Sequence, residues 1–211
     1  LSPLNPGYGP HNMARCHYKF NPDRKYILHD PDNMPERVFP GGDMLHALTM
    51  ASTQLAFLRR ADRVKIGCMT GGLGAVCASN HDHVWKAASH YVFALMMKYA
   101  KGISLQTAVD CETYDIPGYA IDDNSQYPNK EGVPYVDAAT AWDKENDTVS
   151  VFVINRNAET DYPVSIDAHA FEGYTFKEHI AMYSEDLEVK NTYENPDALL
   201  PKTVKDASFE N

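Results

Sequence analysis

Two stretches of the chain carry apolar residues at the spacing of an amphipathic helix. In residues 43–60 and again in residues 84–100 they recur every three or four positions, which places them on one face. Asp43 can cap the first helix, and Lys101-Gly102 should end the second. We therefore expect two helices that each bury one side. Their apolar stripes are Met44, Leu48, Ala51, Leu55 and Leu58, and Ala88, Val92, Leu95 and Tyr99.

Between these helices the pattern changes to alternation. Val64, Ile66 and Cys68 alternate with other residues, which predicts a strand at 63–69, and a glycine-rich turn follows over residues 70–80. A helix, a strand, a turn and a second helix in this order form one unit of an α/β barrel or sheet.

After Gly102 the chain consists of short alternating runs separated by turn residues. The segment Asp143–Asp147 lies between two of these runs and predicts a β-hairpin. We therefore expect an α/β domain over residues 1–102 and an antiparallel β-sandwich over residues 103–211. The expected strands are Tyr135–Trp142, Thr148–Asn155, Tyr162–Ala168 and Tyr174–Tyr183.

Residues 1–42 have no sustained hydrophobic period and are rich in Pro, Gly, Asn, Asp and His. This composition predicts a long irregular loop, and long loops in compact domains are often functional. The chain starts at Leu1, without a start methionine or a signal peptide. We expect it to be a piece of a longer protein.

The composition of the chain argues against two classes of binding partner, nucleic acid and membrane. The chain has 19 Lys and Arg against 29 Asp and Glu, a net charge of -10, and no basic cluster, which argues against nucleic acid. No apolar run reaches the roughly 18 residues of a membrane span. Four cysteines without a Cys-x-x-Cys pair indicate a reducing compartment. We expect a cytoplasmic protein without a cofactor. Secretion is the open alternative, because the chain is expected to lack the start of its protein.

Several motifs occur in the order found in one enzyme family. Over residues 36–201 they resemble the family 51 glycoside hydrolases, the α-L-arabinofuranosidases. The motifs are Leu58-Arg-Arg, Ala61–Cys68, Trp85, a helix that contains Tyr91, Tyr99-Ala-Lys-Gly102, Val133–Ala139, Val151–Arg156, Glu178–Ile180 and Asn191–Pro196.

The resemblance implies a (β/α)8 barrel followed by a jelly-roll-like β-sandwich. Such enzymes are retaining exo-glycosidases that remove terminal arabinofuranosyl units from plant cell-wall polysaccharides and oligosaccharides, as in arabinan degradation. They use one glutamate as general acid/base and a second as nucleophile, with the carboxyl groups about 5–5.5 Å apart. Members commonly form homo-oligomers.

The two catalytic glutamates of this family are not expected inside this chain. Both belong to earlier barrel strands, and no glutamate precedes Glu36. A (β/α)8 barrel also needs at least about 200 residues, more than residues 1–102 provide. We therefore assign no catalytic residue. The chain is expected to be the C-terminal part of the enzyme, partnered by the rest of the barrel and lacking the last strand of its sandwich.

Candidate substrate-binding residues lie where barrel active sites form, after the strand. The family has a glutamine at the position of Gly71 and an asparagine at that of Gly74, so polar sugar contacts are missing there. Asp62 lies at the opposite end of the strand and is interpreted as structural. Beyond the strand, the loop Asn80–His83 is expected to face the site.

Several chemistries are open for this loop and its surroundings. Asn80, His81 and His83 can contact sugar hydroxyls, His81 and His83 have a spacing that permits a metal, and Asp82 can cap a helix. We expect no metal. Trp85 can stack on a sugar or pack in its helix.

Two further candidates lie in the long N-terminal loop. Tyr8 and His17 can line a subsite or belong to an ordinary exposed loop.

A different class of function is also open. The sandwich alone can be a non-catalytic carbohydrate-binding or structural module. In that case an exposed aromatic platform is expected, formed by Tyr135, Trp142, Tyr162 and Tyr174.

Overall fold

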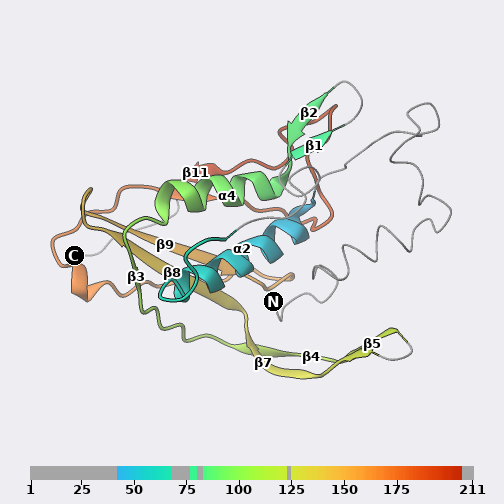
Figure 1. The fold of residues 1–211 in the computed structure, drawn as a ribbon, viewed down its shortest axis with the longest axis horizontal. Coiled ribbons are helices and arrows are strands. Elements are labelled where there is room, and N and C mark those ends of the chain that lie inside the picture. Colours follow the sequence, from blue (N-terminus) through green and yellow to red (C-terminus); the bar gives the residue numbers. More distant parts are fainter. Residues whose placement is uncertain (1–41, 68–76, 80–82, 123–124, 206–211) are drawn as a thin grey trace.

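The computed structural model describes residues 42–67, 77–79, 83–122 and 125–205. Within them, one helix lies against an antiparallel sheet and a second helix lies beside the first (Figure 1). The helices are α2 (Met44–Arg59) and α4 (Ala88–Tyr99). The predicted loop at residues 1–42 lies outside the described residues, apart from Gly42.

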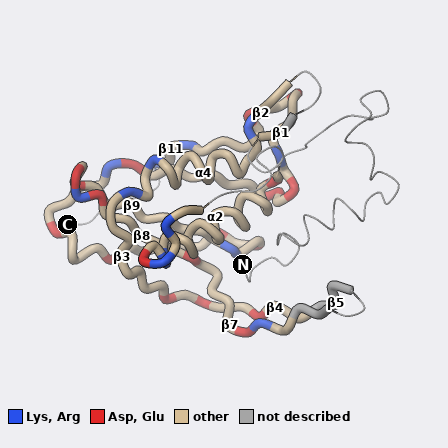
Figure 2. The backbone as a smooth tube through the Cα atoms, viewed as in Figure 1, with Lys and Arg blue, Asp and Glu red and all other residues tan. Residues whose placement is uncertain are grey.

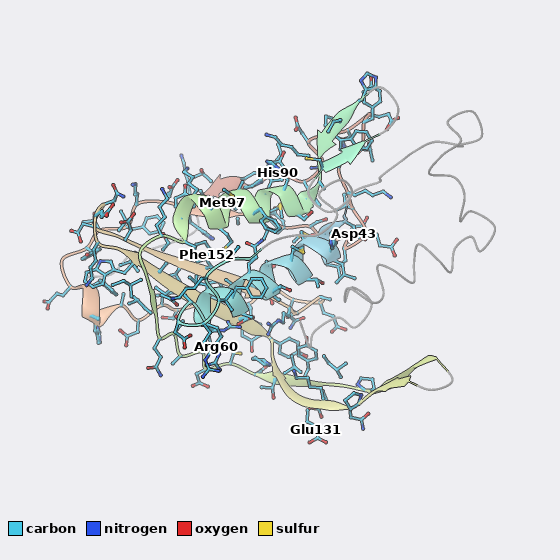
Figure 3. The ribbon with its side chains drawn as sticks, viewed as in Figure 1. Asp43, Arg60, His90, Met97, Glu131 and Phe152 are labelled. Carbon is cyan, nitrogen blue, oxygen red and sulfur yellow. The ribbon has the colours of Figure 1, made fainter. Side chains whose placement is uncertain are left out.

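The helix predicted at residues 43–60 is confirmed as α2. The backbone N–H of His46 donates to Asp43 Oδ1 at 2.8 Å, so Asp43 is the expected N-cap. Figure 3 shows Asp43 at this end of the helix. The buried side of α2 includes Met44, Ala47 and Leu55.

The helix predicted at residues 84–100 starts later than expected. Residues Val84–Lys86 form strand β2, which pairs antiparallel with β1 (Cys77–Ser79), and α4 begins at Ala88. The sequence pattern of residues 84–86 fits either a helix or a strand. The strand forms because residues 77–79 offer it a hydrogen-bonding partner, which helix periodicity does not reveal.

The strand predicted at residues 63–69 is not found in its described part. Residues 61–67 form a turn and irregular backbone, and Ile66 is 82% exposed. A barrel strand is held by hydrogen bonds to neighbours on both sides, and no described strand pairs with residues 63–67. Cys68, Met69 and the turn up to residue 76 lie outside the described residues.

The hairpin predicted around Asp143–Asp147 is confirmed. Strands β8 (Val136–Asp143) and β9 (Thr148–Asn155) pair along their whole length, and β3 (Ile103–Leu105) pairs with the other edge of β8. Asp143 Oδ1 accepts from the backbone N–H groups of Glu145 and Asn146, which closes the turn. This three-stranded sheet is the base on which α2 lies.

The other described strands form antiparallel pairs outside this sheet. β4 pairs with β7 and β5 with β6, and together they form an arm that projects away from the helices (Figure 1). β10 pairs with β11. The bounds are β4 (Thr113–Ile116), β5 (Tyr119–Asp122), β6 (Ser125–Tyr127), β7 (Lys130–Pro134), β10 (His179–Ala181) and β11 (Lys202–Val204).

Two of the predicted strands are wrong in extent. Residues Tyr162–Ala168 have no strand, and of Tyr174–Tyr183 only β10 is a strand, while His169–Phe171 form a short 3-10 helix, η5. These segments are largely exposed, so alternation there does not reflect a buried face. The antiparallel character of the C-terminal region is confirmed.

The core joins helices and sheet across the predicted domain boundary near residue 102. Leu55 of α2, Ala139 of β8 and Ile154 of β9 form one buried cluster, against which Phe152 packs. Figure 3 shows Phe152 between the helices and the sheet. A second cluster includes Met44, Val92 and Leu199. Both helices are therefore anchored by C-terminal residues.

No described helix is long and apolar enough to cross a membrane. Figure 2 shows Lys and Arg of the described part dispersed among acidic residues along the tube.

Candidate functional site

Two of the predicted site residues, His83 and Trp85, are described, and both lie at the hairpin of β1 and β2. Residues 83 and 85 are two positions apart at a strand, so both side chains point to the same face. Gly71, Asn80, His81, Tyr8 and His17 lie outside the described residues, as do Gly74 and Asp82. The structure therefore shows one part of the expected surface.

Tyr193 completes the cluster from a distant part of the sequence. Its ring is stacked on that of His83, with centroids 4.0 Å apart and planes 13° apart. The Trp85 ring is 6.4 Å from Tyr193 and tilted by 51°. We call these three residues the aromatic cluster. Tyr193 is 47% exposed and His83 is exposed, so the cluster faces solvent.

A buried asparagine fixes the position of this cluster. Asn191 is 1% exposed; its Nδ2 donates to the carbonyls of Lys86 and Leu199, and its Oδ1 accepts from the N–H of Leu199. The indole Nε1 of Trp85 donates to the carbonyl of Asn191 at 2.8 Å. Both sides of the Asn191 side chain are therefore satisfied. Residues 191–199, which we call the C-terminal loop, are therefore held to the β1–β2 hairpin by these hydrogen bonds.

The turn that carries Tyr193 is closed by two hydrogen bonds. The N–H of Thr192 donates to the carbonyl of Asn195, and the N–H of Asn195 donates to Oγ1 of Thr192, both at 3.1 Å. Tyr193 lies inside this turn, which limits the freedom of its backbone.

Neighbouring charges and burial act on Tyr91 of α4. Burial raises the pKa of Tyr91, and the carboxylate of Asp197 acts in the same direction. Lys86 Nζ lies 5.8 Å from the centre of its ring. Burial and the Asp197 carboxylate both favour the neutral phenol of Tyr91.

The alternative that Trp85 packs within a helix is wrong, because Trp85 belongs to β2 and bonds to the C-terminal loop. Asp62 Oδ2 lies 3.6 Å from Arg63 Nε, and both side chains are exposed. Among the described residues no group of three His, Cys, Asp or Glu could hold a metal ion. Cys77 and Cys111 are free thiols and half-buried.

The sequence prediction did not include Asn191 and Tyr193 in the site. Both belong to the motif Asn191–Pro196, whose Asn and Pro residues indicate a turn. The motif gave no sign that it lies against Trp85, which is 106 residues away from Asn191 along the chain.

Comparison with known proteins confirms the resemblance of the sequence. A family model described as the α-L-arabinofuranosidase C-terminal domain matches residues 28–211. An intracellular exo-α-(1→5)-L-arabinofuranosidase of Bacillus subtilis is 27% identical over 150 residues, 70% of this chain and 28% of the relative. One from Streptomyces lividans is 25% identical and covers 79% of this chain and 24% of the relative. The chain thus spans about three-tenths or less of these relatives.

Solved structures share the fold. A family 51 α-L-arabinofuranosidase of Bifidobacterium longum matches with a TM-score of 0.63 and 24% identity, over 79% of this chain and 31% of the other. The α-L-arabinofuranosidase of Thermotoga maritima in complex with arabinose matches with a TM-score of 0.64 and 19% identity, over 78% and 34%.

Proposed function

Since the chain belongs to the α-L-arabinofuranosidase C-terminal domain family, we propose that it is the C-terminal part of a retaining exo-glycosidase. The whole enzyme removes α-L-arabinofuranosyl units from plant cell-wall polysaccharides or oligosaccharides. The observation that carries this proposal is the family match over residues 28–211. The relatives' own names describe exo-enzymes that act on α-(1→5)-linked arabinofuranose.

In this proposal the two catalytic glutamates lie outside the chain. A general acid at neutral pH needs a carboxyl group whose pKa is raised by burial or by a nearby like charge. Every described glutamate is exposed, and residues 1–35 contain no glutamate. These facts support the proposal that the rest of the barrel provides both catalytic carboxyl groups.

Within the enzyme, residues 1–102 complete the (β/α)8 barrel and residues 103–211 form the sandwich that packs on it. The candidate substrate-binding residues Gly71, Asn80, His81, His83 and Trp85, with Tyr8 and His17, line the open face. We extend the intracellular location in the relatives' names to this enzyme, and propose a homo-oligomer that needs no cofactor.

The rival hypothesis of a free-standing sandwich module has less support. Leu55 of α2 is buried with Ala139 and Ile154 of the sheet, so the sheet would lose part of its core without the helix. The part of the proposed aromatic platform formed by Trp142 and Tyr174 is also not flat. Trp142 meets Phe171 edge-on, Phe171 meets Tyr174 edge-on, and the tyrosines are half-buried.

The proposal is tested by assaying nitrophenyl α-L-arabinofuranoside with the longer protein and with the 211-residue chain alone. The longer protein should release arabinose, and NMR of the first product should show that the anomeric configuration is retained. The chain alone should show no turnover because it lacks both glutamates. Turnover by the chain alone, verified by intact mass, would contradict the proposal.

A further inference from the structure

We infer that Tyr193, with His83 and Trp85, forms an outer subsite that binds a pentose ring of the polysaccharide beyond the reacting sugar. This inference rests on the proposed function, since it names the substrate class of that same site. Tyr193 is the specificity-determining residue of this subsite.

The first argument is that the aromatic cluster is exposed but held in place. Tyr193 and His83 are stacked at 4.0 Å and both face solvent. The hydrogen bonds of Asn191 fix the strand that carries Trp85, and the turn between Thr192 and Asn195 fixes the backbone of Tyr193. Binding to rings that are already ordered costs little conformational entropy.

The second argument concerns what can bind there. A stable protein partner buries about 800 Å² on each side, whereas an aromatic side chain buries about 150–250 Å². Three partly covered rings are too small for a protein interface. They match one or two sugar rings, whose C–H faces pack on aromatic planes.

The third argument distinguishes this subsite from the reaction centre. The reacting sugar needs a closed site with two carboxyl groups, whereas His83 and Tyr193 of the aromatic cluster are exposed to solvent. Glu194 and Asn195, which follow Tyr193, are exposed in the same turn and can accept hydrogen bonds from sugar hydroxyls. An open ring contact of this kind favours sugar units of the polysaccharide that extend out of the site.

The test compares two substrates in the longer enzyme. Steady-state kinetics are measured on a linear arabino-oligosaccharide and on nitrophenyl α-L-arabinofuranoside, for wild type, Tyr193→Ala and Tyr193→Phe. Tyr183→Ala is the matched control, because Tyr183 is 72% exposed and lies outside the cluster.

Tyr193→Ala should raise KM for the oligosaccharide about three- to tenfold and leave kcat unchanged, since a lost aromatic contact is worth about 0.5–1.5 kcal/mol. The KM of Tyr193→Ala for the nitrophenyl substrate should match that of wild type. The KM values of Tyr193→Phe and Tyr183→Ala should match wild type for both substrates. An unchanged oligosaccharide KM in Tyr193→Ala, or equal losses on both substrates, overturns the inference.

Failure of the proposed function is a separate result. If wild type hydrolyses neither substrate, the proposed activity is wrong, and the subsite is then decided by binding alone. In ¹H–¹⁵N spectra of the full 211-residue chain, arabino-oligosaccharide should shift the indole N–H signal of Trp85, and Tyr193→Ala should weaken that shift. No shift in the wild-type chain overturns the subsite.

Discussion

The buried side chain of His46 restricts the residue that can precede the cap of α2. It is 6% exposed in the first turn of α2. A Cβ added to Gly42 would collide with the imidazole of His46, which explains why a glycine precedes the cap. Burial lowers the pKa of His46, while the carboxylate of Asp43 acts in the opposite direction. The fold therefore favours the neutral imidazole.

This shift makes stability depend on pH. A base whose pKa is lower in the folded state is protonated first in the unfolded chain, so its contribution is complete above the ordinary value of 6.5 and is lost as the pH falls below it. The free energy of unfolding, from urea denaturation between pH 8 and 5, should decrease over this range. His46→Gln should reduce the slope.

His90 adds to the same slope, since burial and Lys86 lower its pKa too, so the slope in His46→Gln should not vanish. His169→Gln is the control, because its side chain is 96% exposed. An identical slope in wild type and His46→Gln would contradict the burial argument.

The Asp43 cap was predictable, because capping depends on residues three positions apart. The role of Asn191 was not, because its partners Lys86 and Leu199 come together only in the folded chain. Interactions between residues close in the sequence can be predicted from it, whereas hydrogen bonds between distant residues cannot.

The C-terminal loop and the β1–β2 hairpin depend on each other through Asn191. Without its side chain, the carbonyls of Lys86 and Leu199 and the N–H of Leu199 lose their partners. Buried polar groups without partners cost about 1–3 kcal/mol each.

Asn191→Ala should therefore lower the free energy of unfolding by about 2–4 kcal/mol, measured by urea denaturation. Asn146→Ala is the matched control, since Asn146 hydrogen-bonds Asp143 on the exposed hairpin turn, and it should cost less than about 1 kcal/mol. Equal effects of the two substitutions would show that the loop is not anchored by Asn191.

The elements differ in how well the sequence predicted them. The β8–β9 hairpin was found because its alternation and turn are local. Strand β2 was missed, and the strand expected at residues 63–69 is absent from its described part, residues 63–67, because three to five residues form a strand only where a partner is present. Partner strands are a property of the fold and leave little trace in a short segment.

An ionic cluster connects the helical part to the sheet. Its Asp137 and Arg156 side chains are largely buried, whereas the Arg59 side chain is 35% exposed. Asp137 of β8 accepts from Arg59 of α2 and from Arg156, which follows β9. The two guanidinium groups also donate to the carbonyls of Ala138 and Pro134, both at 3.0 Å. Burial lowers the pKa of Arg156, and the carboxylate of Asp137 opposes that effect. One carboxylate thus compensates two cations across both predicted domains.

Removing that carboxylate should destabilise the whole molecule. Asp137→Asn leaves Arg59 and Arg156 without their anion and should lower the free energy of unfolding by about 3–5 kcal/mol in denaturant titration. Asp62→Asn removes an exposed pairing with Arg63 and should cost at most about 1 kcal/mol. If Asp137→Asn also costs less than 1 kcal/mol, the helix is not tied to the sheet through this cluster.

The anchoring of β2 by the C-terminal loop also sets an order of events during synthesis. Trp85 bonds to a residue made 106 positions later, and the N–H groups of Met44 and Leu45 donate to the carbonyls of Val189 and Leu187. At about 5–20 residues per second, a ribosome needs roughly 5–20 s to cover the distance from Trp85 to Asn191. During that interval the hairpin lacks its partner, and the start of α2 likewise stays without its partners until Leu187 and Val189 are made, so this surface is open to chaperones and proteases until the C-terminal loop is synthesised.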